Sequence, residues 1–543
     1  MSDVIVDIPS AVNEIVKDYE PGSVDRNNLH TKLSAMENKL YDIPIIIGGQ
    51  EISTGNKGQC RQPHNHQHIL AEFHKAGTDE VCNAIDTAKD AWHSWSNTPI
   101  RERAAIFRTA AKLLAGPWRD TINAATMLNQ SKNVYQAEID SACELIDFFN
   151  FNAQFAEEIY SNQPLISPDG IENKLEYRSL EGFVFAVSPF NFTSIAGNLP
   201  TAPALMGNVV LWKPASSSVY SGYFIMKLLH EAGLPKGVIN FLPGSGNQVG
   251  DPIINSPQLA GLHFTGSTEV FNSMWKKIGK NISIYNTYPR IVGETGGKDF
   301  ILAHDTANTA ALATAMVRGA FEYQGQKCSA ASRCYIPESI WKEVKDNYLD
   351  QVQSIKMGDV NDFSNFMNAV IDDVAFEKIV SYIDYVRNAS EADIISGGGY
   401  DKTIGYFIEP TTILTSNPYF KTMEEEIFGP ILTIYVYNET WSEICTIVDK
   451  TSRYSLTGAI FAQDKSTIEV GRRILRHSAG NFYINDKPTG AVVGQQPFGG
   501  SRASGTNDKA GSHLNLLRWI SHRTIKENFS PPIDYRYPFL ESD

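Results

Sequence analysis

The sequence has few of the features that mark secreted, membrane or nucleic-acid-binding proteins. Its 543 residues include six cysteines and no Cys-x-x-Cys pair, which argues against a disulfide framework and favours a reducing compartment. No apolar run approaches the roughly 20 residues that span a bilayer, so we expect no membrane partner. The net charge is −14, so the chain also lacks the excess of lysine and arginine that a nucleic-acid partner would need.

The N-terminus shows neither of two common targeting patterns, so targeting stays open. Residues 1–22 are acidic, without the apolar stretch of a secretory signal or the arginine-rich, acid-poor character of a mitochondrial transit peptide. We expect the polar residues 1–40 to form an N-terminal arm or helix on the surface. The usual dinucleotide fingerprint, G-x-G-x-x-G, is absent as well, so any evidence for a cofactor must come from other motifs.

Two blocks of alternating strand and helix patterns follow the arm. A chain of this length predicts two or three domains of about 150–200 residues. Apolar residues at helical spacing dominate the chain up to residue 160, including one long amphipathic helix, QAEIDSACELIDFFNFNAQFAEEIY. Short β-rich runs then alternate with helices over roughly 183–290, which is typical of a parallel sheet in a nucleotide-binding α/β unit. A second alternating block begins after Glu294.

Four short motifs carry groups that could contact a ligand. Lys213 ends the apolar strand of LWKPASSS, and Asn191 follows the strand before SPFN. Gly266 lies in HFTGSTEVF, a strand–turn–helix pattern whose helix N-terminus can attract phosphate. Glu294 is surrounded by glycines in GETGGKD, so a ligand can approach its carboxylate closely. Each motif alone is more often an ordinary turn or strand end, and none decides the function by itself.

The stretch YQGQKCSAASRCY holds two cysteines in different settings. Cys328 follows a predicted helix end and a glycine, a place where a thiolate can serve as a nucleophile. Cys334 falls in ASRCYIP, whose period-two alternation predicts a strand, so we expect a packed and inert thiol there.

One stretch rich in histidine resembles a metal site. The stretch CRQPHNHQH contains Cys60, His64, His66 and His68, but no carboxylate is close by. A polar loop or exposed strand is the favoured interpretation, and we predict no metal.

The order of seven motifs points to a known family. SPFN, WKP, FTGS, GETGGK, GQKCS, EEIFGP and PFGG together resemble the NAD(P)-dependent aldehyde dehydrogenase superfamily over roughly residues 45–525. Longer stretches, such as FEYQGQKCSAASR and VGQQPFGGSRASGTNDKAG, are similar to its delta-1-pyrroline-5-carboxylate dehydrogenases.

The resemblance implies an α/β fold with three parts and a homo-oligomer built on a dimer. The parts expected from it are a Rossmann-like NAD-binding domain (41–165 and 183–293), an α/β catalytic domain (294–488) and a β-flap for oligomerisation (166–182 and 513–543). The family in eukaryotes is usually mitochondrial, so the matrix is implied, with the cytoplasm as the alternative because no transit peptide is evident.

The resemblance also implies a reaction. The substrate would be L-glutamate γ-semialdehyde, the ring-opened form of delta-1-pyrroline-5-carboxylate, and the product L-glutamate, in proline catabolism with NAD. Cys328 matches the nucleophile, Glu294 the base that activates water, and Asn191 the oxyanion donor, with the backbone N–H of Cys328.

Binding residues are implied in the same way. Those that match NAD contacts are Lys213, Gly266, Ser267, Thr268, Glu269, Val270, Glu426 and Phe428. Those that match substrate contacts are Ser188, Phe192, Ser329, Gly490, Ala491 and Phe498. Gly490, Ala491 and Ser329 would hold the α-carboxylate, and the two phenylalanines would flank the aliphatic part.

Two departures from the family pattern bear on affinity. The family often has Gly-Ser where this chain has Gly490-Ala491, so one hydroxyl donor is missing and we expect weaker substrate binding. Ser216 stands where many members carry a glutamate that repels a 2′-phosphate, so NAD is expected but NADP stays open. Two other functions are also open: oxidation of another short aldehyde, and a catalytically silent structural member of the fold.

Overall fold

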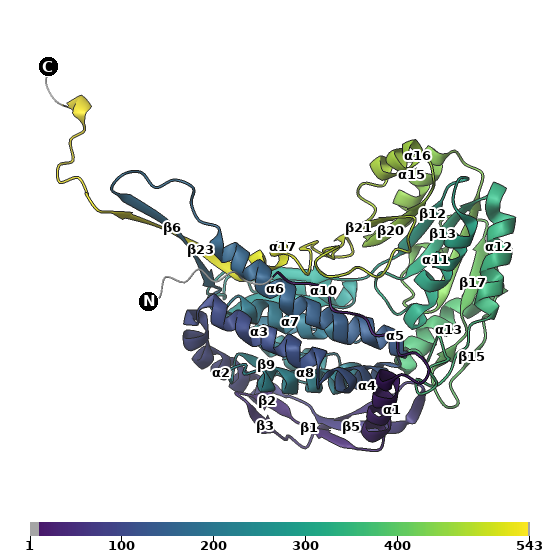
Figure 1. Ribbon diagram of the computed structural model, residues 1–543, viewed down its shortest axis with the longest axis horizontal. Coiled ribbons are helices and arrows are strands. Elements are labelled where there is room, and N and C mark those ends of the chain that lie inside the picture. Colours follow the sequence, from purple (N-terminus) through teal and green to yellow (C-terminus); the bar gives the residue numbers. More distant parts are fainter. Residues whose placement is uncertain (1–9, 541–543) are drawn as a thin grey trace.

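Two seven-stranded sheets organise residues 10–540, the part of the chain that the computed structural model describes. In Figure 1 the first sheet and its helices form the left and lower part of the molecule, and the second sheet and its helices form the right-hand part. The α/β class expected from the sequence is confirmed, with a largely parallel sheet in each part.

The first sheet has the strand order β11-β10-β7-β8-β9-β2-β3. The five strands from β11 to β9 run parallel, and β2 and β3 follow in antiparallel pairs at the other edge. The strands are β2 (Ile45–Ile47), β3 (Gln50–Ile52), β7 (Phe183–Val187), β8 (Val209–Lys213), β9 (Ile239–Phe241), β10 (Leu259–Thr265) and β11 (Arg290–Glu294). The helices of this part are α2 (Thr78–Asn97), α3 (Ile100–Ala115), α4 (Arg119–Gln130), α5 (Val134–Ala137), α6 (Glu144–Ser161), α7 (Thr193–Leu205), α8 (Val219–Glu231), α9 (Gly246–Ile254) and α10 (Thr268–Lys280).

The second sheet has the order β14-β17-β18-β13-β12-β20-β21, parallel except for β14. Its strands are β12 (Asp299–Ala303), β13 (Ala331–Pro337), β14 (Ala392–Ser396), β17 (Thr411–Thr415), β18 (Ile431–Tyr437), β20 (Thr457–Phe461) and β21 (Asn481–Ile484). The helices that accompany it are α11 (Thr309–Phe321), the short η3 (Glu322–Gly325), α12 (Glu338–Gln353), α13 (Asp373–Arg387), α14 (Lys421–Glu424), α15 (Trp441–Thr451) and α16 (Lys465–Ile474).

A two-stranded ribbon projects from the body of the molecule. Strand β6 (Ile171–Ser179) pairs antiparallel with β23 (Ile520–Asn528) over nine residues each. Figure 1 shows this ribbon extending away from both sheets, with the C-terminal segment continuing beyond it. The segment carries exposed apolar side chains, among them Phe529, Ile533 and Phe539.

The N-terminal region is more integrated than an exposed arm would be. Residues 10–20 run extended, and α1 (Val24–Glu37) buries Leu29, Leu33 and Met36. The hairpin β4 (Lys57–Gln62) and β5 (Asn65–His74) lies beside β1 (Tyr41–Ile43).

The structure also tests two local predictions, a long helix and a strand that carries Cys334. The long helix predicted through residue 160 forms, but a π-helical turn, η1 (Glu138–Cys143), joins α5 to α6 within it. ASRCYIP is strand β13 and Cys334 is buried, as predicted. Strand β13 lies inside the sheet, and all of its residues but Ser332 are buried.

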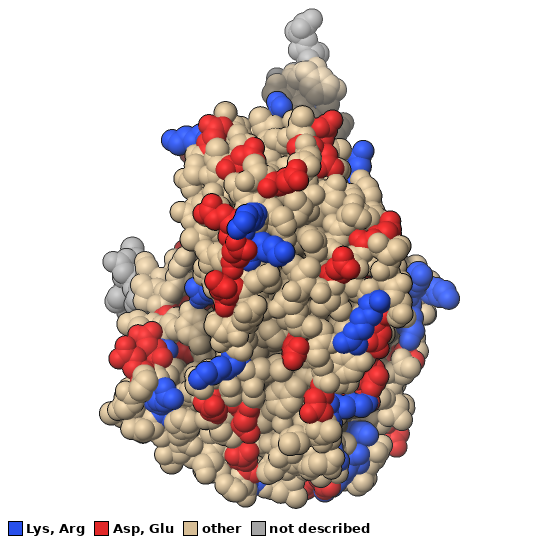
Figure 2. All heavy atoms as spheres, turned by 90° about the vertical axis from the view of Figure 1, so that its right-hand side faces the viewer, with Lys and Arg blue, Asp and Glu red and all other residues tan. Residues whose placement is uncertain are grey.

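Charge and hydropathy are distributed as in a globular protein. Figure 2 shows the side of the molecule that lies on the right in Figure 1, where acidic and basic side chains are interspersed. Among residues 10–540, no helix is long and apolar enough to cross a membrane. Over the same residues, no group of three or more His, Cys, Asp or Glu side chains is arranged to hold a metal ion.

Candidate active site

One cavity collects residues from both halves of the chain. Its wall includes the end of β11, the turn that precedes β13, the start of α7 and the loop 489–498. Seven residues singled out in the sequence line it: Phe192, Glu294, Cys328, Ser329, Gly490, Ala491 and Phe498. Strand ends and loops bring these side chains together although they lie up to three hundred positions apart in the chain.

Glycines build the turn that presents Cys328. Residues 323–325 have φ of 52°, 54° and 66°, so the chain leaves η3 through left-handed backbone. A Cβ on Gly325 would lie 2.2 Å from the carbonyl oxygen of Gly429, and one on Gly297 would lie 1.9 Å from the carbonyl oxygen of Cys328. Only glycine fits at either position, because neither backbone oxygen can move aside.

The electrostatic surroundings of Cys328 disfavour the thiolate. Burial of the sulfur, followed by the charges of Asp299, Glu294 and Glu426, raises the pKa of the thiol well above its ordinary value. The thiol is therefore protonated in the protein alone. A positively charged ligand beside the sulfur would lower this pKa and favour the nucleophilic form.

Glu294 is a partly buried carboxylate at the cavity wall. The Gly500 N–H donates to its Oε2 at 3.3 Å, and a Cβ on Gly499 would come within 2.9 Å of its Oε1. Burial raises the pKa of Glu294 well above its ordinary value, although Gly500 N–H and the charge of Lys509 oppose the shift. A carboxyl with a pKa raised in this way is suited to accept a proton near neutral pH.

Lys509 is a neighbour of this carboxylate that sequence analysis missed. Its ammonium donates to the carbonyl oxygens of Gly480 and Gly499, at 2.8 and 3.0 Å. Burial lowers the pKa of Lys509, and Glu294 partly offsets this. No sequence pattern predicted Lys509, because its position near Glu294 comes from the folding of a glycine-rich loop.

Asn191 reaches the Cys328 turn from the first sheet. It is buried after β7, and its Nδ2 donates to the carbonyl oxygen of Gln326 at 3.1 Å, two residues before the cysteine. A primary amide carries two N–H groups, so a second one is available for an oxygen on a substrate.

The predicted substrate residues form two kinds of wall. Phe192 and Phe498 supply aromatic surface, while Ser329, Gly490 and Ala491 supply polar groups. The Ser329 hydroxyl lies 2.8 Å from that of Thr489, a contact that the sequence did not indicate. Gly490 has φ of +95°, which favours glycine at this position.

Ser188 is the exception among the predicted substrate residues. It does not line the cavity, and its hydroxyl accepts a hydrogen bond from the Trp212 indole at 2.9 Å. Its backbone N–H donates to the Lys213 carbonyl oxygen, so it lies next to the cofactor-side residues. The pattern of the chain put Ser188 near Asn191 but could not reveal that its side chain faces Trp212.

Charged groups on η1 and α6 complete the wall. Asp140, Glu144 and Lys327 line the cavity, and Lys132 Nζ lies 2.6 Å from Asp140 Oδ2. Burial and the charge of Asp140 raise the pKa of Glu144 to about 8. Sequence analysis treated this segment only as an amphipathic helix, yet two acids four positions apart within a largely apolar stretch were a usable signal.

The predicted cofactor residues lie around strand ends of the first sheet. Lys213 ends β8, and its buried ammonium donates to the Pro214 carbonyl oxygen at 3.0 Å. Burial lowers the pKa of this lysine to about 8. Ser267 caps α10 by accepting from the Val270 N–H at 3.3 Å.

The rest of this group spans both halves of the molecule. Thr268 donates to the Ala503 carbonyl oxygen, whereas Glu269 is exposed and pairs with Arg453 at 3.1 Å. Glu426 is a partly buried carboxylate that accepts from the Gly297 N–H at 2.9 Å. Phe428 has φ of 62° and packs edge-on against Phe190.

These residues fit a dinucleotide. The N-terminus of α10 follows the turn containing Gly266, where backbone N–H groups suit a pyrophosphate. Lys213 is a buried cation with a carbonyl as its hydrogen-bond partner, and Glu426 is a carboxylate acceptor of the kind that binds ribose hydroxyls.

Comparisons with known proteins agree with this site. Residues 51–525 match the model of the aldehyde dehydrogenase family. The chain is 52% identical to a mitochondrial delta-1-pyrroline-5-carboxylate dehydrogenase of Dictyostelium discoideum, over 98% of this chain and 96% of that one. It is 47% identical to a mitochondrial enzyme of the same name from Danio rerio, over 97% and 95%. The crystal structure of Delta-pyrroline-5-carboxylate dehydrogenase from Mycobacterium tuberculosis bound with NAD is 49% identical, with a TM-score of 0.96 and all of both chains covered.

Proposed function

The chain belongs to the aldehyde dehydrogenase family, and on that premise we propose that it oxidises L-glutamate γ-semialdehyde to L-glutamate with NAD. The observation that carries the proposal is a single cavity lined by a cysteine, a partly buried glutamate and the Gly490-Ala491 loop. These are a nucleophile, a base and a place for a carboxylate.

The first half of the reaction forms a bond to sulfur. The Cys328 thiolate attacks the aldehyde carbon, and the carbonyl oxygen becomes an oxyanion that the Asn191 amide and the Cys328 N–H stabilise. NAD, when bound, supplies the oxidant that takes two electrons and one hydrogen from this carbon. The substrate is then held on Cys328 as a thioester.

The second half releases the product by hydrolysis. Glu294 takes a proton from a water molecule, and the resulting hydroxide attacks the thioester carbon. The carbon–sulfur bond breaks, and the carboxylic acid leaves while Cys328 is regenerated. The raised pKa of Glu294 supports this role, because it makes the carboxylate a better proton acceptor.

Substrate and cofactor selection use separate groups. We assign Ser329, Gly490 and Ala491 to the α-carboxylate and the rings of Phe192 and Phe498 to the aliphatic chain, all at the cavity wall. Ser188 is left out of this set. For NAD we assign the residues around strands β8 and β10 and the turn after α14: Lys213, Gly266, Ser267, Thr268, Glu269, Val270, Glu426 and Phe428.

The test compares two aldehydes. NADH formation is measured with delta-1-pyrroline-5-carboxylate and with propanal, which lacks the α-carboxylate. We expect a kcat/KM at least about 10² larger for the semialdehyde, because two or more polar contacts are lost with propanal. A preference for propanal would indicate another short aldehyde as substrate, and no NADH from either would indicate a silent member of the fold.

Domain roles, assembly and compartment belong to the same proposal. We assign 41–165 and 183–293 to NAD binding, 294–488 to catalysis, and 166–182 with 513–543 to oligomerisation. The projecting β6–β23 ribbon supports a homo-oligomer built on a dimer. Two relatives named mitochondrial support the matrix as the compartment, which fractionation of the source cells would test.

A further inference from the structure

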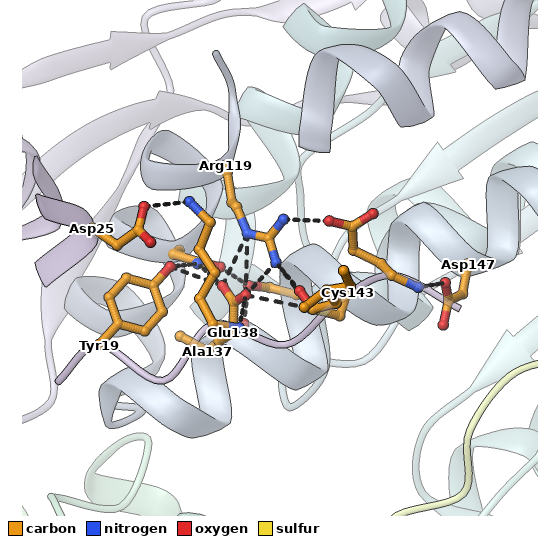
Figure 3. Close-up of polar contacts among 12 residues, drawn as sticks. Tyr19, Asp25, Arg119, Ala137, Glu138, Cys143 and Asp147 are labelled. Carbon is orange, nitrogen blue, oxygen red and sulfur yellow. Dashed lines mark hydrogen bonds and ion pairs between the residues drawn. The ribbon is translucent and has the colours of Figure 1, made fainter. Parts of the chain in front are cut away.

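The extended segment 10–20 lies across the outer side of α4, η1 and α6. Arg119, at the start of α4, donates to the Ile15 carbonyl oxygen and pairs with Glu14 at 2.6 Å and with the buried Glu138. Tyr19 donates to Glu138 Oε2 at 2.9 Å. Figure 3 shows Arg119 and Glu138 at the centre of this network, with Asp25 towards one end and Asp147 at the other.

One residue of the segment reaches further, to the loop that contributes Gly490 and Ala491 to the cavity wall. The Asn13 carboxamide donates to Asp147 Oδ2 on α6 at 2.8 Å and to the Val493 carbonyl oxygen at 2.7 Å. Its Oδ1 accepts from Gln495 Nε2 at 2.9 Å. Asn13 therefore joins a rigid helix to the loop that carries Gly490 and Ala491.

The loop makes few other hydrogen bonds to the rest of the protein, although Val493 is buried. Between Gly490 and Gln496, the hydrogen bonds that the structure shows to groups outside this span, within residues 10–540, are both made by Asn13. The remaining ones close the span on itself, such as Val492 N–H to Gln496 Oε1 at 3.0 Å. A loop whose backbone lines a binding site without regular structure depends on such ties for its position.

We propose that Asn13 is a positioning residue for recognition of the substrate α-carboxylate, because it fixes the Gly490-Ala491 backbone against α6. This inference rests on the proposed function. It assigns the N-terminal segment a part in substrate selection, although Asn13 itself does not line the cavity. Without the hydrogen bonds of Asn13, the Gly490-Ala491 backbone that binds the carboxylate is held less firmly. Cys328 and Glu294 stay in place, since neither contacts residues 10–20.

The experiment is a comparison of two substrates in Asn13→Ala. For the semialdehyde we expect KM to rise about 3- to 10-fold with kcat within about 2-fold, as for the loss of one or two neutral hydrogen bonds. For propanal, which has no carboxylate, we expect both constants to stay within about 2-fold of wild type. A loss of equal size with both aldehydes would overturn the proposal, because it would show a general structural effect, and so would no change with either.

A second variant and a control keep the test decisive if Asn13→Ala is unstable. Gln495→Ala removes one of the two bonds from an exposed position, and we expect a smaller rise in semialdehyde KM, about 2-fold. Val12→Ala, next to Asn13 and 75% exposed, is the matched control and should behave as wild type. An unchanged KM in Gln495→Ala together with an unstable Asn13→Ala would count against the proposal.

Amide hydrogen exchange gives a readout that needs no turnover. In Asn13→Ala we expect faster exchange in residues 489–498 and unchanged exchange in β11 and β13. Failure of the proposed function itself is recognised separately, because wild-type protein would then fail to prefer the semialdehyde over propanal.

Discussion

At the scale of single residues, the site depends on a carboxyl and a thiol that lie partly buried at the cavity wall. Glu294 and Cys328 both have pKa values raised well above the ordinary ones, chiefly through burial. The charged forms that the proposed chemistry requires are therefore disfavoured in the protein alone. Such groups lower the stability of the fold, and their shifted pKa values suit them to catalysis.

Glu294→Gln tests the effect of this carboxyl on stability and on activity. The unfolded chain loses the Glu294 proton near the ordinary pKa of 4.5 and the folded chain loses it at higher pH, so this group's contribution to stability falls as pH rises above that value. Glutamine stays neutral, so we expect the melting temperature of the variant relative to wild type to increase from pH 5 to pH 8. We expect kcat to fall by about 10²-fold or more. The assignment would be contradicted if the melting temperature of the variant relative to wild type fell from pH 5 to pH 8, or if kcat were unchanged.

Ala491→Ser tests the carboxylate anchor. The serine hydroxyl adds one hydrogen-bond donor, worth about 0.5–1.5 kcal/mol, so we expect the KM for the semialdehyde to fall about 2- to 12-fold. The KM for propanal, measured beside it, should not change. If the semialdehyde KM is no lower in the variant, Ala491 does not lie at the carboxylate.

At the scale of elements, the π-helical turn η1 separates two polar networks. Glu138 contacts Arg119 and the N-terminal segment, whereas Asp140 contacts Lys132 and lines the cavity. A π turn within an α-helix rotates the following residues, which changes the directions in which neighbouring acids point.

Arg119→Met measures how far this element depends on its buried pair. Arg119 and Glu138 side chains are 3% and 0% exposed, and removal of one partner of a buried pair leaves the other charge unpaired. We expect the free energy of unfolding to fall by about 3–5 kcal/mol in urea denaturation. Arg472→Met, which breaks the exposed pair with Glu469, is the control and should have a small effect. Equal effects of the two variants would show that the buried pair has no special weight.

Elements with local signals were the predictable part of the fold. Strand β10, its turn and α10 could be read from HFTGSTEVF, because glycine and a serine N-cap mark such boundaries. The direction of the Ser188 side chain and the hydrogen bond between Asn13 and Val493 could not be predicted, since each depends on a residue more than twenty positions away. The π turn has no sequence pattern that would have marked it. The roles of the predicted site residues stay predictions until variants are measured.

At the scale of the whole molecule, the β6–β23 ribbon and the segment after it present apolar side chains to solvent. Phe529, Ile533 and Phe539 are 61%, 103% and 79% exposed, which is unusual for a stable monomer and favours burial against another copy.

Truncation of residues 521–543 tests the proposed assembly. The deletion removes all of β23 after Ile520, so β6 loses its partner. We expect light scattering to show a dimer or an assembly of dimers for the full chain and a monomer for the truncated one. If the full and the truncated chain form assemblies with the same number of copies, the ribbon does not mediate assembly.

The central claim is that Cys328 carries the oxidation of glutamate γ-semialdehyde. The most direct measurement is NADH formation from delta-1-pyrroline-5-carboxylate by wild type, Cys328→Ala and Cys334→Ala, the last being a buried cysteine six positions away on β13. We predict turnover by wild type and by Cys334→Ala, and a loss of at least about 10³-fold in Cys328→Ala. Turnover by Cys328→Ala at the wild-type rate would contradict the account.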